Sequence, residues 1–248
     1  MVPNLFTVGN MALGFFSIVA SIQERWVEAA SVIIVGHLFD ILDGRVARWI
    51  GHTSRFGAEF DSFADWITFG LAPGIMVYLL FLKDFGKFGF LLAFFYVFTG
   101  ALRLARFNVK SLKEEEGPNV NFMGLPIPGA GGFLAILVLL FVYFERGYQG
   151  KTMSLLYNHA PFVQQGIPVI VFVLALLMMS KIEYSTFKKT RFFYPKSLRA
   201  FLIMLFVCFM IYAYPQNTIF FLYIGYILWG ILNATWRTYR LRKLANRS

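Results

Sequence analysis

The sequence is poor in charge and almost without cysteine. Only 15% of its 248 residues are charged and 58% are hydrophobic, whereas an ordinary soluble domain is about 25% charged. This composition excludes intrinsic disorder, and the repeated apolar blocks of about twenty residues are too long to cover in one soluble core. The single cysteine, Cys208, excludes an intrachain disulfide and a thiolate metal cluster. We therefore expect a protein embedded in lipid.

Several other signals are missing from the sequence. It contains no repeat of about 20–50 residues, no low-complexity tract and no nucleic-acid-binding module. Residues 1–4 carry no basic segment ahead of the first apolar run, so we expect the first helix to stay in the membrane rather than to be cleaved as a signal peptide. We therefore interpret the formal net charge of +10 first as a signal of membrane topology and not as evidence for nucleic-acid binding.

The apolar runs predict an all-α polytopic membrane protein with eight spanning helices. The basic and aromatic stretch 184–196 divides the chain into a core of six helices, residues 1–183, and a C-terminal part, residues 184–248, with an interfacial segment and two more helices. The expected helices are residues 4–23, 26–50, 57–82, 87–108, 126–145, 164–182, 198–213 and 217–236.

The basic residues predict how these helices are oriented. Eight spans place both termini on one side, and with the termini in the cytoplasm the Lys and Arg residues near the helix ends divide 18 to 5 in favour of the inside. Cytoplasmic loops of membrane proteins carry such an excess. We therefore expect both termini in the cytoplasm, with the basic residues in contact with anionic membrane lipids.

Four aspartates lie near the ends of two predicted membrane helices. An aspartate at the centre of a membrane helix costs about 2.5–3.5 kcal/mol, yet Asp40, Asp43, Asp61 and Asp65 fall within 26 residues. The spacings i, i+3 and i, i+4 place each pair on one helical face. Because a short turn joins the two helices, the four carboxylates can converge.

Converging carboxylates without cations would repel one another. Oxygen ligands suit hard cations such as Mg²⁺ or Mn²⁺, and two such ions form the usual clamp for displacement at phosphorus. Gly44 and Ala47 lie on the same face as the first aspartate pair, where small side chains let a ligand approach the backbone. Arg48, Ser54 and Arg55 follow as candidate contacts to phosphates or a nucleotide.

Two other interpretations of the carboxylates remain open. They could form a structural network with Arg45, Arg48 and Arg55, since charges in membranes often pair with one another. They could also line the ion pathway of a cation-coupled transporter. Transporter sites usually lie near the midplane of inverted repeats, and no such repeat is visible in this sequence.

Residues 40–65 fit the CDP-alcohol phosphotransferase motif D-x2-D-G-x2-A-R-x8-G-x3-D-x3-D at every fixed position. Three further segments, residues 3–10, 101–108 and 122–128, look like the membrane-embedded bacterial and archaeal phosphatidylserine synthase branch of that family. The resemblance covers residues 3–183, and the last two helices carry no recognised motif. It implies a six-helix core, a homodimer, and a plasma (inner) membrane location with the site facing the cytoplasm.

The resemblance implies transfer of a phosphatidyl group from CDP-diacylglycerol to L-serine, with release of CMP and use of two divalent cations. Asp40, Asp43 and Asp61 are then expected to bind metal, and Asp65 to bind one metal and accept the serine hydroxyl proton. A related enzyme with glycerol phosphate or an inositol compound as acceptor is the nearest alternative. The expected CDP-binding residues are Gly44, Ala47, Arg48, Ser54 and Gly57.

Four further residues are candidates for binding the serine or the phosphates. Asn4 and Thr7 could equally cap the first helix, and Arg103 and Arg106 could be topology determinants that snorkel from a helix end. His37 precedes the first aspartate by one turn and is either its partner or, more simply, a packing residue. The segment 124–132, rich in glycine and proline, either shapes an entry for substrate or forms a turn before close helix packing.

Overall fold

The computed structural model describes residues 2–50, 55–113, 122–145, 160–180, 182–184 and 198–245, with the backbone alone described at several helix ends. These residues are almost entirely helical. The helices and the two short strands are α1 (Val2–Ile22), α2 (Trp26–Ile50), α3 (Arg55–Asp65), η1 (Trp66–Leu71), α4 (Ala72–Val77), η2 (Tyr78–Leu82), η3 (Lys83–Phe85), α5 (Gly86–Lys113), β1 (Phe122–Met123), α6 (Ile127–Glu145), α7 (Ala160–Met179), β2 (Glu183–Tyr184), α8 (Leu198–Ala213) and α9 (Pro215–Ala245).

Most of the helix bounds predicted from the sequence agree with the structure to within a few residues, and the all-α class is confirmed. Helices α5 and α9 are longer than predicted, since they end at Lys113 and Ala245 and not at residues 108 and 236. The stretch predicted as one helix, residues 57–82, is a continuous helical rod whose hydrogen bonding changes along its length. It switches from α-helix to π-helix at η1 and again at η2. Short π-helical turns are frequent at functional sites, and η1 begins directly after Asp65.

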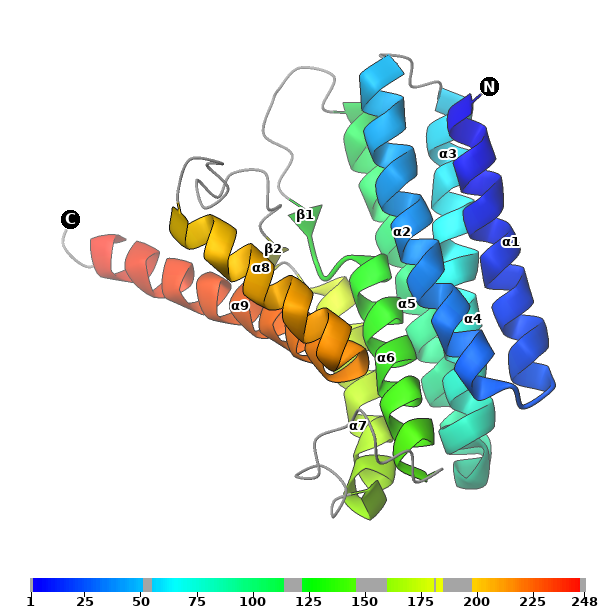
Figure 1. Ribbon diagram of the computed structural model, residues 1–248. Coiled ribbons are helices and arrows are strands. Elements are labelled where there is room, and N and C mark those ends of the chain that lie inside the picture. The colour runs from blue at the N-terminus through cyan, green and yellow to red at the C-terminus, as the bar shows by residue number, and fades with distance from the viewer. Residues whose placement is uncertain are drawn as a thin grey trace.

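Four helical windows in the described part of the chain are long and apolar enough to cross a membrane: Leu5–Ile22, Phe56–Val109, Ile127–Phe144 and Pro215–Trp236. The window Phe56–Val109 reverses at Gly86, whose φ of 56° suits glycine, and so forms two antiparallel rods (Figure 1). Gly166–Met179 and Met204–Ala213 are shorter apolar helices. These helices support a membrane protein, and the number of eight spans stays a prediction.

Helices α1 to α7 stand side by side as a bundle, and α8 and α9 form a hairpin that leans away from it (Figure 1). Helix α2 contacts both α1 and α6, α7 contacts α5, and α9 contacts α6. The bundle interior is filled by fully buried side chains such as Phe69, Tyr96 and Ile136. By contrast, α8 exposes large apolar side chains, among them Phe201 and Phe209, as a helix surrounded by lipid does.

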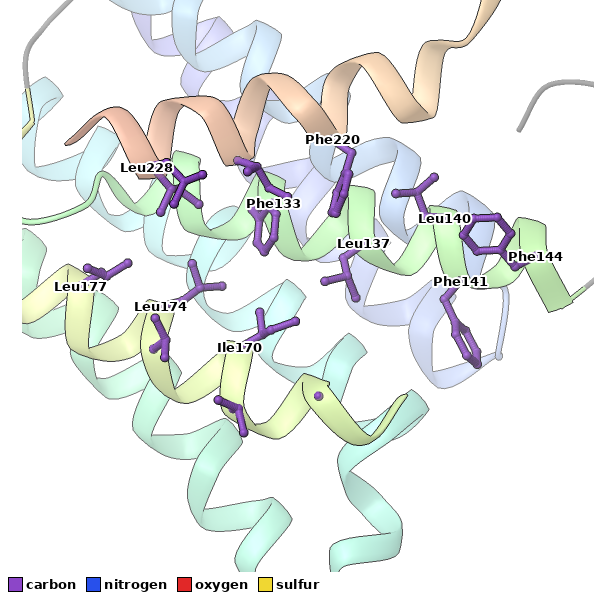
Figure 2. Close-up of a pocket in the computed structure, with 15 residues that line it drawn as sticks. Phe133, Leu137, Leu140, Phe141, Phe144, Ile170, Leu174, Leu177, Phe220 and Leu228 are labelled. Carbon is purple, nitrogen blue, oxygen red and sulfur yellow. The ribbon is translucent and has the colours of Figure 1, made fainter. Parts of the chain in front are cut away.

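An apolar groove of about 600 Å³ runs between α6, α7 and α9 (Figure 2). Its lining residues, which include Phe133, Leu137, Ile170 and Phe220, are all apolar or glycine. A groove lined in this way supplies neither a metal ligand nor a group that can take up a proton. The candidate chemistry lies instead among the polar side chains of α1, α2, α3 and α5.

Candidate active site

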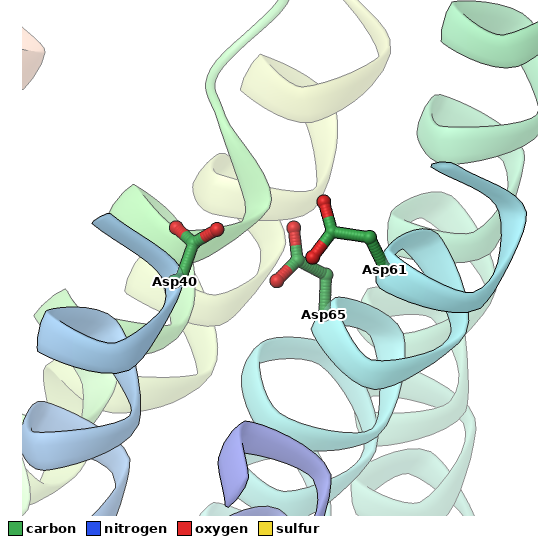
Figure 3. Close-up of side chains that lie close together, drawn as sticks. All are labelled: Asp40, Asp61 and Asp65. Carbon is green, nitrogen blue, oxygen red and sulfur yellow. The ribbon is translucent and has the colours of Figure 1, made fainter. Parts of the chain in front are cut away.

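Three aspartates from two helices meet inside the bundle. Asp40 comes from α2, and Asp61 and Asp65 lie one turn apart on α3; one carboxylate oxygen of each lies within 4.8 Å of the others. Figure 3 shows the three carboxyl groups directed into the space between these two helices. The structure thus brings together three of the four aspartates for which the sequence predicted convergence.

Asp43, the fourth aspartate, lies beside this cluster. Its carboxylate accepts a hydrogen bond from the hydroxyl of Thr7 on α1, and the residue is only 6% exposed. It is also close enough to Asp40 and Asp61 to repel both electrostatically. Thr7, predicted as a binding residue or a helix cap, therefore lies at the site and contacts it through Asp43.

The donor set of the cluster fits hard divalent cations. Carboxylate oxygens are the ligands that Mg²⁺ and Mn²⁺ prefer, and three carboxylates at this separation repel one another unless a cation or a proton is shared between them. One oxygen of Asp61, Oδ1, is buried and has no hydrogen-bond partner among the described residues. A bound cation would supply the partner that this buried carboxylate oxygen lacks.

The alternative of a structural ion-pair network gains no support from the residues that can be described. Arg45 is exposed, and among the described side chains the ion pair within 4.0 Å joins Arg25 to Glu28, away from the aspartates. The side chains of Arg48 and Arg55 lie outside the described part of the chain.

Asn10 on α1 contacts Asp65 directly. Its side-chain amide donates a hydrogen bond to Asp65 Oδ1 at 3.2 Å, and its backbone carbonyl accepts one from Thr68 Oγ1 at 2.8 Å. Asn10 is 1% exposed, and its Oδ1 has no partner among the described residues. The sequence reasoning missed it as a site residue; the available signal was its position one turn after Thr7 on the same helix.

The π-helical turn after Asp65 is held by α5. The indole Nε1 of Trp66 donates to the carbonyl of Val97 at 3.2 Å, and the Tyr96 hydroxyl donates to the carbonyl of Phe69 at 2.9 Å. These bonds fix the end of α3 against the helix that carries both candidate arginines.

The two arginines of α5 have different surroundings. Arg103 is 8% exposed and interacts electrostatically with Asp65, and its Nε has no hydrogen-bond partner among the described residues. Arg106 is exposed and donates to the carbonyl of Met179 at 3.3 Å, at the C-terminal end of α7, where a positive charge is favourable. The structure therefore places Arg103 near the carboxylates and directs Arg106 toward α7.

The structure describes the surroundings of only some of the predicted CDP-binding residues. Gly44 on α2 and Gly57 on α3 are both partly buried. Ser54 lies outside the described residues, and only the backbone is described for Asn4, Ala47 and Arg48. The nucleotide contacts of these residues stay predictions.

The packing around Gly124 and His37 decides between the two interpretations that the sequence left open for each. Gly124 has a φ of 81°, and its N–H donates to the carbonyl of Ile182 at 2.8 Å, which favours the interpretation as a turn before close helix packing. The ring of His37 packs edge-on against Phe69 with centroids 5.6 Å apart, and its Nδ1 lies 2.8 Å from the hydroxyl of Tyr223 on α9. His37 is thus a packed histidine with a partner from the C-terminal hairpin.

Comparison with known proteins agrees with the motif and with this geometry. The family model for CDP-alcohol phosphatidyltransferases matches residues 1–176. A CDP-diacylglycerol–serine O-phosphatidyltransferase of Helicobacter pylori is 34% identical over 233 residues, which cover 93% of this chain and 89% of that protein. One of Bacillus subtilis is 33% identical over 192 residues, covering 76% and 92%. The archaetidylserine synthase of Methanothermobacter thermautotrophicus is 34% identical over 184 residues, covering 73% and 68%. Because the matches span the carboxylate motif and most of the chain, this protein belongs to the CDP-alcohol phosphatidyltransferase family of enzymes.

Proposed function

We propose that the protein transfers the phosphatidyl group of CDP-diacylglycerol to L-serine and releases CMP. The observation that carries the proposal is the convergence of Asp40, Asp61 and Asp65, with oxygens within 4.8 Å of one another, in a chain of this family. The relatives from Helicobacter pylori and Bacillus subtilis are named CDP-diacylglycerol–serine O-phosphatidyltransferases, and the one from Methanothermobacter thermautotrophicus is named an archaetidylserine synthase. These names support serine as the acceptor.

In this proposal the four aspartates hold two divalent cations, Mg²⁺ or Mn²⁺. When bound, such cations neutralise the diphosphate and the departing CMP. Thr7 orients the carboxylate of Asp43 through its hydrogen bond, because an outer hydrogen bond fixes the direction in which a ligating group points. Gly44, Ala47, Arg48, Ser54 and Gly57 line the CDP site.

Asp65 is the proposed general base. The amide of Asn10 holds its Oδ1, which leaves Oδ2 to receive the proton of the serine hydroxyl. The hydroxyl oxygen attacks the phosphorus of the phosphatidyl group, and the bond from that phosphorus to the oxygen of CMP breaks with its electron pair leaving on CMP. A positioned general base contributes about 10²–10⁴-fold to the rate of such a step.

Arg103 is the proposed contact for the serine carboxylate. It is a buried cation that interacts electrostatically with Asp65, so an anion bound to it would stand next to the proposed base. Burial strengthens such a charge-assisted contact relative to one made in water. Arg106 and Asn4 stay weaker candidates for contacts to the phosphates.

The site geometry suits a reaction between a lipid and a water-soluble acceptor. Asp40 and Asp43 lie in the second half of α2, and Asp61 and Asp65 lie in the first half of the helical rod of residues 55–82, so all four lie toward the side on which α2 ends and this rod begins. The excess of basic residues predicts that this side is cytoplasmic. We therefore propose an enzyme of the inner membrane with its site and both termini facing the cytoplasm, acting as a homodimer.

The test is an acceptor panel on the purified full-length protein. CDP-diacylglycerol is supplied with Mg²⁺ or Mn²⁺ and with L-serine, glycerol 3-phosphate or inositol, and the lipid product is identified by mass spectrometry. Serine-dependent CMP release with phosphatidylserine as product is the expected result. Release driven by another acceptor would move the protein to a different branch of the family. Cation flux into vesicles with no CMP release would instead support the transporter interpretation.

A further inference from the structure

The C-terminal hairpin contacts the helix of the first two aspartates although it carries no recognised motif. The family model ends at residue 176, and α9 lies wholly beyond it. Helix α9 nevertheless packs along α6, where Phe133 stacks on Phe220 with ring centroids 5.7 Å apart (Figure 2). About one turn further along α9, the hydroxyl of Tyr223 lies 2.8 Å from Nδ1 of His37 on α2. The hairpin is therefore bonded directly to the first motif helix.

Two adjacent glycines of α6 make room for the partners of His37. A Cβ atom at Gly132 would collide with the hydroxyl of Tyr223, and one at Gly131 would collide with the backbone of Phe69 in η1. The ring of His37 contacts both partners, since its centroid lies 6.1 Å from that of Tyr223 and 5.6 Å from that of Phe69. The histidine thus belongs to a packed unit to which α2, η1, α6 and α9 all contribute.

This unit lies one helical turn from the carboxylate cluster on both helices that carry it. Asp40 follows His37 by three residues on α2. Asp65 precedes Phe69 by four residues in the helical rod of residues 55–82. Each spacing is about one turn, and the two pairs follow opposite sequence order. The contact between His37 and Phe69 therefore helps to set how far Asp40 lies from Asp65, whose carboxylate oxygens are within 4.8 Å of each other.

The orientation of the His37 ring matters because α2 and η1 are already close at this level. A Cβ atom at the neighbouring Gly36 would lie 2.8 Å from Cγ2 of Thr68. The imidazole ring meets Phe69 edge-on, with 62° between the ring planes, and a turned ring would need a different separation of the helices. A hydrogen bond to one ring nitrogen fixes the orientation of a histidine ring. Among the described residues, the bond to Tyr223 can do so here.

We propose that Tyr223 is a positioning residue: by holding the ring of His37 it sets the separation of Asp40 from Asp65, and with it the affinity of the site for a divalent cation. The inference rests on the proposed function only for its metal site and not for its acceptor. Mg²⁺ demands near-ideal ligand geometry, so a small shift between two ligating carboxylates weakens its binding. The inference gives α9 a role in the chemistry although it lies beyond the part of the chain that the family model matches.

The experiment is direct binding of Mn²⁺ to the purified full-length protein without substrate, followed by the electron paramagnetic resonance signal of the free ion. Tyr223→Phe keeps the ring and removes the hydroxyl. It should weaken Mn²⁺ binding about tenfold, the lower end of the effect of losing an outer hydrogen-bond partner at a metal site. The kcat for CMP release at saturating metal should change less than about twofold, because bound cations draw the carboxylates back into place.

Tyr212→Phe is the matched control. It removes the same hydroxyl from the same hairpin, at a residue that is 86% exposed on α8, and should bind Mn²⁺ as the wild type does. A merely structural role of Tyr223 would lower the melting temperature and leave the affinity of the folded protein for Mn²⁺ unchanged. That result would overturn the inference.

A double variant tests whether Tyr223 acts through His37. His37→Phe keeps an aromatic ring against Phe69 but cannot bond to Tyr223. Tyr223→Phe added to His37→Phe should therefore weaken Mn²⁺ binding no further, because the two changes remove one shared interaction. Additive effects would overturn the inference. Absence of Mn²⁺ binding in the wild type would overturn the proposed metal site and this inference with it, whereas Mn²⁺ binding without serine-dependent CMP release would overturn the proposed acceptor alone.

Discussion

The carboxylate region and the C-terminal hairpin are built on different principles. Around the aspartates, α1, α2, α3 and α5 exchange side-chain hydrogen bonds, such as those from Thr7 to Asp43 and from Asn10 to Asp65. The hairpin of α8 and α9 exposes mostly apolar side chains and meets the bundle along one face. Polar groups that are buried together must each find a hydrogen-bond partner. In the carboxylate region this requirement restricts which residue types can stand at many positions, and the spacing between those positions is set by the helices. The hairpin needs only a few contacts and leaves no motif in the sequence.

The largest expected effect comes from removing a charge of the cluster. Asp61→Asn should lower CMP release about a hundredfold or more and raise the Mg²⁺ or Mn²⁺ concentration needed for half-maximal rate, since even the outer partners of metal ligands are worth about 10–100-fold. Glu59→Gln makes the same acid-to-amide change on α3 at an exposed residue and is the control. Equal metal requirements in the two variants would remove the basis for a metal site.

Substitution of the two arginines of α5 should affect KM for serine to clearly different extents. Arg103→Ala is expected to raise KM for serine about 10–100-fold, because a hydrogen bond to a charged group contributes about 1.5–3 kcal/mol. Arg106→Ala should change it less than about twofold, because this exposed side chain contacts the carbonyl of Met179 and exposed charges contribute little. The measurement is serine saturation at fixed CDP-diacylglycerol. A larger effect at Arg106 would contradict the assignment.

A smaller effect is expected from Asn10→Ala, which removes the amide that holds Asp65. Loss of that bond should lower kcat about tenfold with little change in KM for either substrate. Ser17→Ala serves as the control, since it deletes another buried polar group of α1, whose hydroxyl donates to the carbonyl of Ala29 at 2.9 Å. If both variants lose activity alike, Asn10 contributes to folding and not to the site.

The smallest effect on activity and the clearest on stability is expected at the hairpin contact. Gly132→Ala places a methyl group against Tyr223 and should destabilise the protein by about 1–3 kcal/mol, the usual cost of overpacking. Gly225→Ala on α9 meets no other atom within 4 Å and should not change the melting temperature. Identical melting curves for the two variants would mean that the hairpin is not seated on α6 as described.

The sequence predicted the carboxylate cluster because its signal is local. Asp61 and Asp65 repeat at helical spacing, the motif around them fits at every fixed position, and one short turn joins their helix to that of Asp40. The helices themselves were predictable from apolar runs of sufficient length. The π-helical turn after Asp65 was not, since a change of hydrogen-bond register leaves no mark on composition.

The partners of the cluster could be predicted only in part, because they depend on tertiary contacts. Thr7 and Arg103 were candidates from the resemblance, whereas Asn10, a single amide one turn after Thr7 on an apolar helix, was not singled out as a site residue. Arg103 and Arg106 differ by three residues on one helix, so spacing alone gave no reason to separate them. Tyr223 reaches His37 from 186 residues away in the sequence, a pairing that only the packing of α9 against the bundle reveals.

The most direct test of the central claim is CMP release from CDP-diacylglycerol by Asp65→Asn, measured beside the wild-type protein with Mg²⁺ or Mn²⁺ and with or without L-serine. We expect serine-dependent release in the wild type and a turnover about 10²–10⁴-fold lower in the variant, as loss of a general base requires, with a smaller change in the affinity for CMP. Turnover near the wild-type value in Asp65→Asn would contradict it.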